Sequence, residues 1–167
     1  PSGVVLGRGD SGPITIRLFA QRPTRIFIGA PEYLTWLLAF RCLSMGAHLS
    51  IVAADAKRWQ GLVDSVNRSG GTVDVVARGR TLPASGRPYR PSLIIDDVGA
   101  FESIQGNLGS WQAVFTIGDA AASGAVFALR NCDLALVSPA DAKVQDNLRR
   151  AYSLNPRQLK RAVNLGH

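Results

Sequence analysis

The sequence predicts an α/β fold with a mainly parallel sheet and helices on both faces, either Rossmann-like or like a degenerate P-loop domain. Two observations predict it. Short β-rich segments alternate with helical segments along most of the chain, and several strands are apolar without alternation, as in sheets covered on both faces. An N-terminal β-hairpin and C-terminal helices complete the expected fold. With 167 residues, 46% of them apolar, we expect one domain over residues 1–167.

The first part of the chain contains the predicted hairpin, two buried strands and two helices. GVVLG and ITIRLF flank the turn-forming residues RGDSGP, which predicts a hairpin over residues 4–19. RIFIG (25–29) is the first buried strand, and a helix follows from about Pro31 to Met45. AHLSIVAA (47–54) is the next strand. Asp55 then caps a helix with an apolar stripe, formed by Trp59, Leu62, Val63 and Val66.

The second part continues the alternation and ends in helices. We expect strands at TVDVVA (72–77), SLIIDDVG (92–99), AVFTIG (113–118) and CDLALVS (132–138). An arginine-rich loop, a weak helix or loop at 103–112 and a short helix within 120–131 connect them. SPAD (138–141) and NPRQ (155–158) each place a capping side chain before a proline, which predicts two short terminal helices.

The turn after the first buried strand lies where many α/β proteins hold a phosphate, but it lacks the ligands. A Walker A loop needs several glycines, a lysine and a following Ser or Thr. This turn has one glycine, Gly29, and none of the lysines Lys57, Lys143 and Lys160 follows a glycine or precedes Ser or Thr. Glu32, in the first helical turn, would repel a phosphate. The sequence therefore predicts no bound nucleotide cofactor.

An acidic pair, Asp96 and Asp97, ends the strand SLIIDDVG and resembles the magnesium-binding end of a Walker B strand. Without a phosphate loop the pair has no metal-bound nucleotide to serve. We therefore expect these carboxylates to cap the strand end or to pair with nearby arginines such as Arg87 or Arg90.

Cysteine and histidine are too few and too scattered for a metal or catalytic site. Cys42 and Cys132 belong to no metal-ligand or redox spacing, so we expect two buried free thiols. A catalytic triad or a Cys/His pair would depend on His48, because the other histidine, His167, is the last residue. The sequence therefore predicts no metal, no catalytic residues and no enzyme activity.

The formal charge of +7 favours an acidic partner, either a protein, an anionic membrane surface or a nucleic acid. The basic residues gather in the loop RGRTLPASGRPYRP (78–91) and in the C-terminal helices. The candidate partner-binding residues are Arg78, Arg80, Arg87, Arg90, Arg149, Arg150, Arg157, Lys160 and Arg161. Nucleic acid is not expected, because among the C-terminal basic residues only Tyr152 could stack on a base.

The longest apolar run, YLTWLLAFRCLSMGA, is too short to span a bilayer, which predicts a buried helix.

A family resemblance runs through the order of these segments. SGVVLGR, ITIRLF, PTRIFIG, an apolar helix and MGAHLSIVAAD with a downstream Trp resemble the C-terminal soluble region of EccE, a membrane component of actinobacterial type VII (ESX) secretion systems. The resemblance covers residues 2–62 best and is only a pattern from Gly70 onwards. It implies that this chain is a fragment of a longer protein with an N-terminal membrane anchor, so that the domain lies at the cytoplasmic face of the inner membrane.

The same resemblance implies partners. EccE assembles with EccB, EccC and EccD, and the family has no established catalytic residues to carry over to this chain. We therefore expect a non-catalytic structural and interaction domain of a type VII secretion membrane complex, with no cofactor. A weaker likeness to FtsK-type translocase domains leaves a degenerate nucleotide-binding domain as the alternative, and a basic nucleic-acid-binding module is a third possibility.

Overall fold

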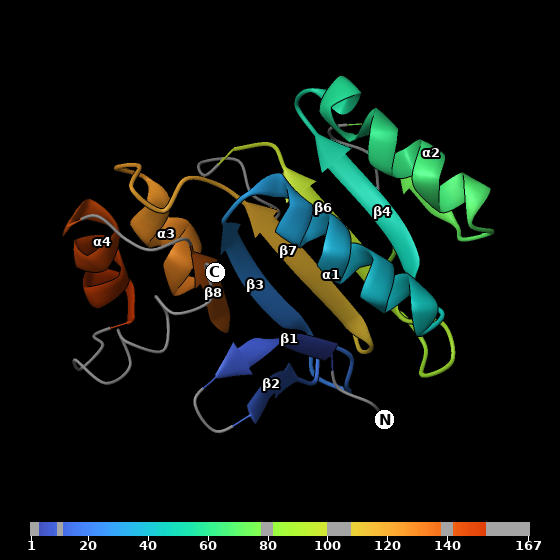
Figure 1. The fold of residues 1–167 in the computed structure, drawn as a ribbon, viewed down its shortest axis with the longest axis horizontal. Coiled ribbons are helices and arrows are strands. Elements are labelled where there is room, and N and C mark those ends of the chain that lie inside the picture. The colour runs from blue at the N-terminus through green and yellow to red at the C-terminus, as the bar shows by residue number, and fades with distance from the viewer. Residues whose placement is uncertain (1–3, 10–11, 78–81, 100–107, 138–141, 153–167) are drawn as a thin grey trace.

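The centre of the fold is a parallel β-sheet, in a computed structural model that describes residues 4–9, 12–77, 82–99, 108–137 and 142–152. The strands of this sheet are β3 (Thr24–Gly29), β4 (His48–Ala53), β5 (Val73–Val75), β6 (Ser92–Asp97), β7 (Gln112–Ile117) and β8 (Leu134–Val137). They lie in the order β5-β4-β6-β7-β3-β8, and all neighbours are parallel (Figure 1). The predicted α/β fold is confirmed.

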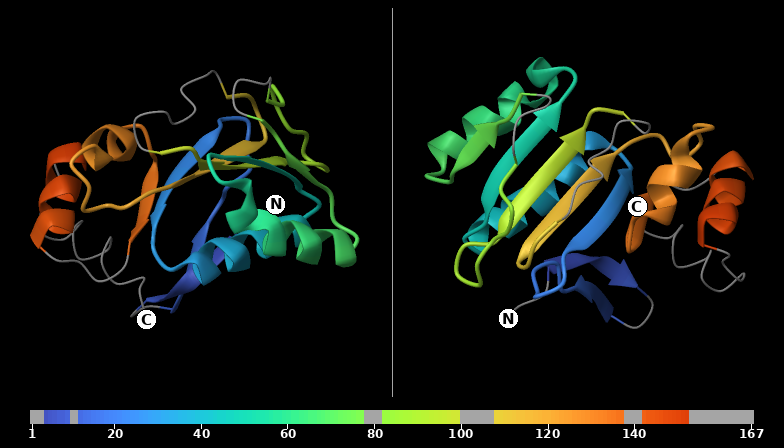
Figure 2. Two further views of the ribbon diagram at one scale, coloured as in Figure 1. Left: turned by 90° about the horizontal axis from the view of Figure 1, so that it is seen from above. Right: turned by 180° about the vertical axis from the view of Figure 1, so that it is seen from behind.

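Helices lie on both faces of the sheet, as predicted, but on the second face they pack only at the end formed by β3 and β8 (Figure 2). They are α1 (Glu32–Ser44), the 3-10 helix η1 (Ala56–Trp59), α2 (Gln60–Arg68), α3 (Ala125–Arg130) and α4 (Ala142–Tyr152). Helices α1 and α2 lie on one face, and α3 and α4 lie beside β8 toward the other face (Figure 2). Strand β3 is buried between them, because Ile26 and Ile28 pack in the core with α1 while Phe27 packs against α3 and α4.

The N-terminal hairpin consists of β1 (Val4–Gly9) and β2 (Gly12–Ile16), which pair antiparallel. It forms a two-stranded sheet of its own and adds no strand to the parallel sheet. The strand also ends at Ile16 and not at residue 19. Leu18 and Phe19 leave the hairpin and are buried in the main core, so burial of these two side chains ends the strand.

The ends of the first two helices are as the sequence predicts. Pro31 precedes α1, and Gly46 follows it with a φ of 92°, a conformation that favours glycine. The Asp55 side chain accepts a hydrogen bond from the Lys57 backbone N–H and so caps η1, which leads directly into α2. The apolar stripe lies against the sheet with Trp59 and Leu62 fully buried. Within the described residues, no helix is long and apolar enough to cross a membrane.

Other predicted segments are shorter than expected or lie outside the described residues. Strand β5 covers only Val73–Val75 of the expected segment 72–77. The short helix expected within 120–131 is α3, and the first C-terminal helix is α4. The capping residues 138–141 and the second helix around 155–158 lie outside the described residues, as does the first half of segment 103–112; in its second half, residues 108–111 are a loop and turn that lead into β7.

Helix α4 is attached to the loop before α3 by a buried asparagine. The Asn147 amide donates hydrogen bonds to the carbonyl oxygens of Ala120 at 2.9 Å and Ala122 at 3.0 Å. We expect Asn147→Leu to lower the free energy of unfolding by about 1 to 2 kcal/mol, because it leaves a buried carbonyl without its donor. Urea denaturation measures this loss. The exposed neighbour change Asp146→Asn should alter stability by less than about 0.5 kcal/mol, and an equal effect of both changes would contradict the attachment.

Both cysteines are free and buried, as predicted. Burial raises the pKa of the Cys42 thiol to about 12 and that of Cys132 to about 11. In the unfolded chain these thiols ionise near their ordinary pKa of 9.0, so the unfolded state binds fewer protons above that pH. We expect the free energy of unfolding to be constant below pH 9 and to fall as the pH rises toward 11 and 12.

Urea denaturation from pH 7 to 11 tests this expectation, with the double variant Cys42→Ala/Cys132→Ala as the control. The variant is expected to be less stable at every pH because its core loses volume, so the slope against pH is the informative quantity. The slope above pH 9 should be shallower in the variant. Equal slopes would show that the thiols do not contribute.

Candidate functional site

The crevice in which parallel α/β sheets usually bind ligands lies at the carboxyl ends of β3 and β7. The connection from β3 runs through α1 to β4 on one side, whereas the connection from β7 runs through α3 to β8 on the other. Such a reversal between neighbouring strands opens a crevice beyond their carboxyl ends. The turn after β3 and the acidic end of β6 therefore lie at the edge where a nucleotide would be expected.

The turn after β3 packs closely against the turn after β7. A Cβ atom placed on Gly29 would lie 3.2 Å from the Gly118 carbonyl oxygen and 3.3 Å from the Ala120 Cβ. Glycine fits best here, because any larger residue would push its neighbours apart by a few tenths of an ångström. The close approach narrows the space that a wrapped phosphate would need.

Arg58, at this same edge, bridges two carboxylates from different elements. Its Nε donates to Glu32 Oε1 at 2.9 Å, and its Nη1 donates to Asp97 Oδ2 at 3.1 Å and Oδ1 at 3.3 Å. The guanidinium also lies over the ring of Trp59, 5.2 Å from its centroid. The first turn of α1, the end of η1 and the end of β6 are thereby joined.

Asp97 is the more constrained partner in this arrangement. Its Oδ2 also accepts a hydrogen bond of 2.8 Å from Nε1 of Trp59, whose side chain is fully buried. The Asp97 side chain is 16% exposed, whereas those of Arg58 and Glu32 are 42% and 43% exposed. The two carboxylates and one guanidinium leave a net negative charge, which is unfavourable for a phosphate.

The two members of the acidic pair separate across the sheet. Leu93 and Ile95 of β6 pack on the face covered by α1, and Asp97 follows the same alternation toward η1. Ile94 packs on the opposite face, and Asp96 follows it. Asp96 is buried and accepts a hydrogen bond from the Val98 backbone N–H at 3.4 Å, so its expected role in capping the strand end is confirmed.

The expected pairing of Asp97 with Arg87 or Arg90 is wrong. Both arginines precede β6, whereas Asp97 ends it, and the six residues of the strand separate the two positions by about 20 Å. Arg58 takes the place of these arginines. Arg58 was not among the predicted site residues, although its position between the helix cap Asp55 and the buried Trp59 places it at the carboxyl edge of β4.

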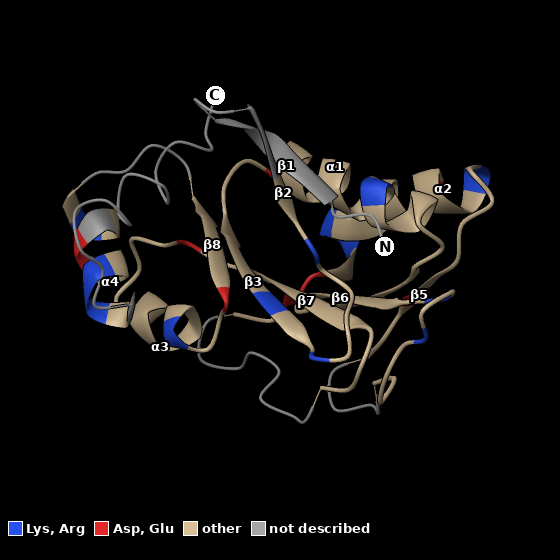
Figure 3. Cartoon of the chain, turned by 90° about the horizontal axis from the view of Figure 1, so that it is seen from below, with Lys and Arg blue, Asp and Glu red and all other residues tan. Residues whose placement is uncertain are grey.

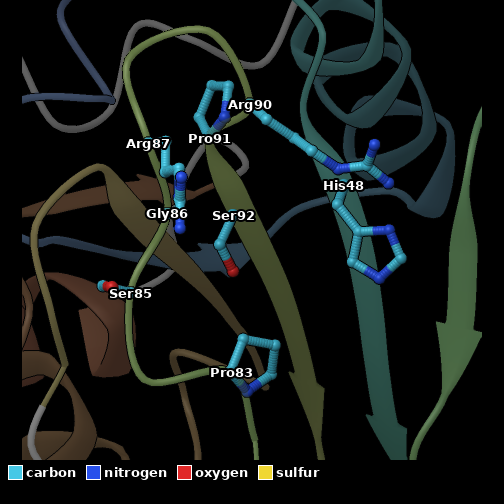
Figure 4. A pocket seen from close by; sticks show the side chains of 8 residues that line it. All are labelled: His48, Pro83, Ser85, Gly86, Arg87, Arg90, Pro91 and Ser92. Atoms are coloured by element: carbon cyan, nitrogen blue, oxygen red, sulfur yellow. The ribbon is translucent and has the colours of Figure 1, made fainter.

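Arg87 and Arg90 lie instead at the amino edge of the sheet, beside a small cavity of about 250 Å³ (Figure 4). His48, at the start of β4, also lines this cavity, and its ring bonds to Thr72 Oγ1 at 2.8 Å and to Asp74 Oδ2 at 2.9 Å. Both ring nitrogens of His48 are therefore held by neighbouring side chains, one by Thr72 and one by Asp74.

Of the other candidate basic residues, none that the structure describes lines this cavity. Arg149 and Arg150 lie exposed on α4, beyond β8 at the far side of the sheet (Figure 3). Arg78, Arg80, Arg157, Lys160 and Arg161 lie outside the described residues. The predicted basic residues thus belong to at least two separate surfaces.

Comparisons of the chain with protein-family models, with curated proteins and with solved structures found no match. The class of the protein is therefore defined by its own geometry, an α/β domain in which Arg58 and two carboxylates lie at the carboxyl edge of the sheet. Among the described residues, no group of three or more His, Cys, Asp or Glu side chains could hold a metal ion.

Proposed function

We propose that this domain is a non-catalytic structural and interaction module. The observation that carries the proposal is the bridge from Arg58 to Glu32 and Asp97, at the edge where an α/β sheet would bind a nucleotide. The charged side chains at this edge pair with one another, so we expect partners to bind at other surfaces of the sheet. The exposed arginines on two sides of the sheet are the surfaces that favour acidic partners.

The setting that we propose for this module is a type VII secretion membrane complex. The support is the resemblance to EccE over residues 2–62, which spans the hairpin, β3, α1, β4 and the start of α2. The module would then belong to a membrane-anchored protein, lie at the cytoplasmic face of the inner membrane and contact EccB, EccC or EccD. Its contribution would be to the assembly or stability of the complex.

Co-purification of the full-length protein from detergent-solubilised membranes tests this setting. We expect secretion-complex subunits to be recovered with it in constant ratio. Recovery of the protein alone, or with DNA and never with such subunits, would overturn the proposed setting.

A nucleotide-binding domain is the second candidate function, because Gly29 and Asp97 do lie at the same edge of the sheet. Calorimetric titration with ATP and GTP in the presence of Mg²⁺ separates the two functions, and we expect no saturable heat. Binding tighter than about 100 μM that Asp97→Asn abolishes would overturn the non-catalytic proposal. Circular dichroism of the variant confirms that it is folded.

A further inference from the structure

Two arginines are held opposite each other in a tight turn at the amino edge of the sheet. The backbone N–H of each donates to the carbonyl oxygen of the other, at 3.0 Å in both directions, so Arg87 and Arg90 form a directly opposed antiparallel pair. Like charges in such a pair repel each other. We name residues 87–90 the arginine turn.

The positive charge of the arginine turn is not neutralised within the described residues. Arg87 donates to the Tyr89 hydroxyl at 3.0 Å and Arg90 to Thr72 Oγ1 at 3.4 Å, and neither forms an ion pair with a described carboxylate. The carboxylate beside the cavity, Asp74, is bonded to the ring of His48 and not to either arginine. From Val75 to Ile95 the sequence contains no acidic residue. Both guanidinium groups are therefore able to pair with an external anion.

The backbone on both sides of the arginine turn is firmly attached to the sheet. The Gly86 N–H donates to the Ser110 carbonyl at 2.8 Å, and the His48 N–H donates to the Pro91 carbonyl at 2.8 Å. Pro88 and Pro91 further restrict the chain. The arginines thus project from a preorganised turn, so little backbone ordering is needed when an anion binds.

The cavity beside the turn has a size and lining that suit a single side chain. Figure 4 shows Arg87 on one side and Arg90, extending toward His48, on the other, with Ser92 between them. The volume of about 250 Å³ is below the range of roughly 300 to 1,000 Å³ that is typical of ligand pockets. A carboxylate side chain fits this space better than a nucleotide does.

We propose that the arginine turn binds a carboxylate side chain in an acidic segment of a protein partner. Tyr89, which is 73% exposed within the turn, supplies the aromatic contact that accompanies arginine at protein interfaces. A membrane surface attracts basic residues through general charge, whereas here the charge surrounds a cavity for one group. The inference rests on the proposed function in one respect only, that the domain acts through interactions.

A fluorescence-polarisation titration tests the proposal, with a fluorescein-labelled peptide of alternating glutamate and glycine as the probe. We expect the double variant Arg87→Gln/Arg90→Gln to bind this peptide about tenfold more weakly than the wild-type domain. Lys57→Gln/Arg68→Gln removes the same charge from η1 and α2 and should change the affinity less than about twofold. Circular dichroism confirms that both variants are folded.

Several outcomes would overturn the proposal. They are the absence of peptide binding, an equal loss in both double variants, and arginine-dependent binding to phosphatidylglycerol vesicles without binding to the peptide. Amide chemical shifts should move at Tyr89, Arg90 and Ser92 when the peptide is added, and shifts confined to α4 would also contradict it. If the peptide binds through the arginine turn while no secretion subunit co-purifies, only the proposed setting fails. If secretion subunits co-purify while the peptide does not bind through the arginine turn, only this inference fails.

Discussion

Gly86→Ala is expected to lower the free energy of unfolding by about 3 kcal/mol or more. A Cβ atom at this position would overlap the Trp111 carbonyl oxygen and lie 2.5 Å from the Ser92 backbone nitrogen. These two atoms are hydrogen-bonded to each other at 2.9 Å, and they belong to backbone that no side-chain rotation can move. The loop before β6 must therefore shift away from the sheet.

Urea denaturation measures this loss, and Ser85→Ala serves as the control. Ser85 is exposed in the same loop, and its replacement should change stability by less than about 0.5 kcal/mol. Amide hydrogen exchange at Ser92 should speed up in Gly86→Ala, because its hydrogen bond to Trp111 is disturbed. If Gly86→Ala is as stable as Ser85→Ala, the loop does not pack against the sheet in the way described.

The same substitution also connects stability to the proposed binding of acidic peptides. Gly86 directly precedes the arginine turn, so a displaced loop would carry Arg87 away from the cavity that it lines. We therefore expect weaker binding of the glutamate peptide even though both arginines are still present. Unchanged affinity would indicate that general charge, and not the geometry of the turn, is responsible for binding.

Asp97→Ala is expected to lower the free energy of unfolding by about 2 to 3 kcal/mol. The substitution leaves the N–H of the fully buried Trp59 without its acceptor, which costs about 1 to 3 kcal/mol. It also leaves Glu32 as the remaining carboxylate partner of Arg58 among the described residues. The ion pairs of this half-exposed arginine add little, at most about 1 kcal/mol, because water screens them.

Glu32→Gln is the matched control for this prediction. Glu32 contacts the same arginine but no buried donor, so its replacement should cost less than about 0.5 kcal/mol. The fluorescence of Trp59 should change in Asp97→Ala more than in Glu32→Gln, because only Asp97 bonds to the indole. Equal losses of stability in the two variants would indicate that the ion pairs, and not the bond to Trp59, hold this edge together.

Most of the sheet could be predicted from the sequence because its strands are buried on both faces. In β3 and β6 the middle of the strand is a run of three apolar residues, 26–28 and 93–95, and such runs identify strands whatever lies beside them. The helix cap at Asp55 was also predictable, because an N-cap is a contact between neighbours in the chain. Whether the hairpin joins the main sheet could not be predicted, because the sequence of residues 4–16 indicates only that the two strands pair with each other.

Of the candidate site, only the absence of phosphate-binding groups could be predicted from the sequence. The missing Walker A lysine and the acidic Glu32 could be read directly from the residues around Gly29. The partner of Asp97 could not, because Arg58 lies 39 residues earlier in the chain and meets Asp97 only after β4 pairs with β6. The prediction named Arg87 and Arg90 because they lie close to Asp97 in the sequence.

Local pattern alone thus specified an α/β chain with buried strands, capped helices and no complete phosphate loop. The tertiary structure decided which charges meet: Arg58 with Asp97 at the carboxyl edge, and Arg87 with Arg90 around a cavity at the amino edge. The physical reason is that apolar periodicity encodes which side chains are buried, whereas the order of parallel strands is set by long connections. That order determines which strand ends become neighbours, and with them the charges that they carry.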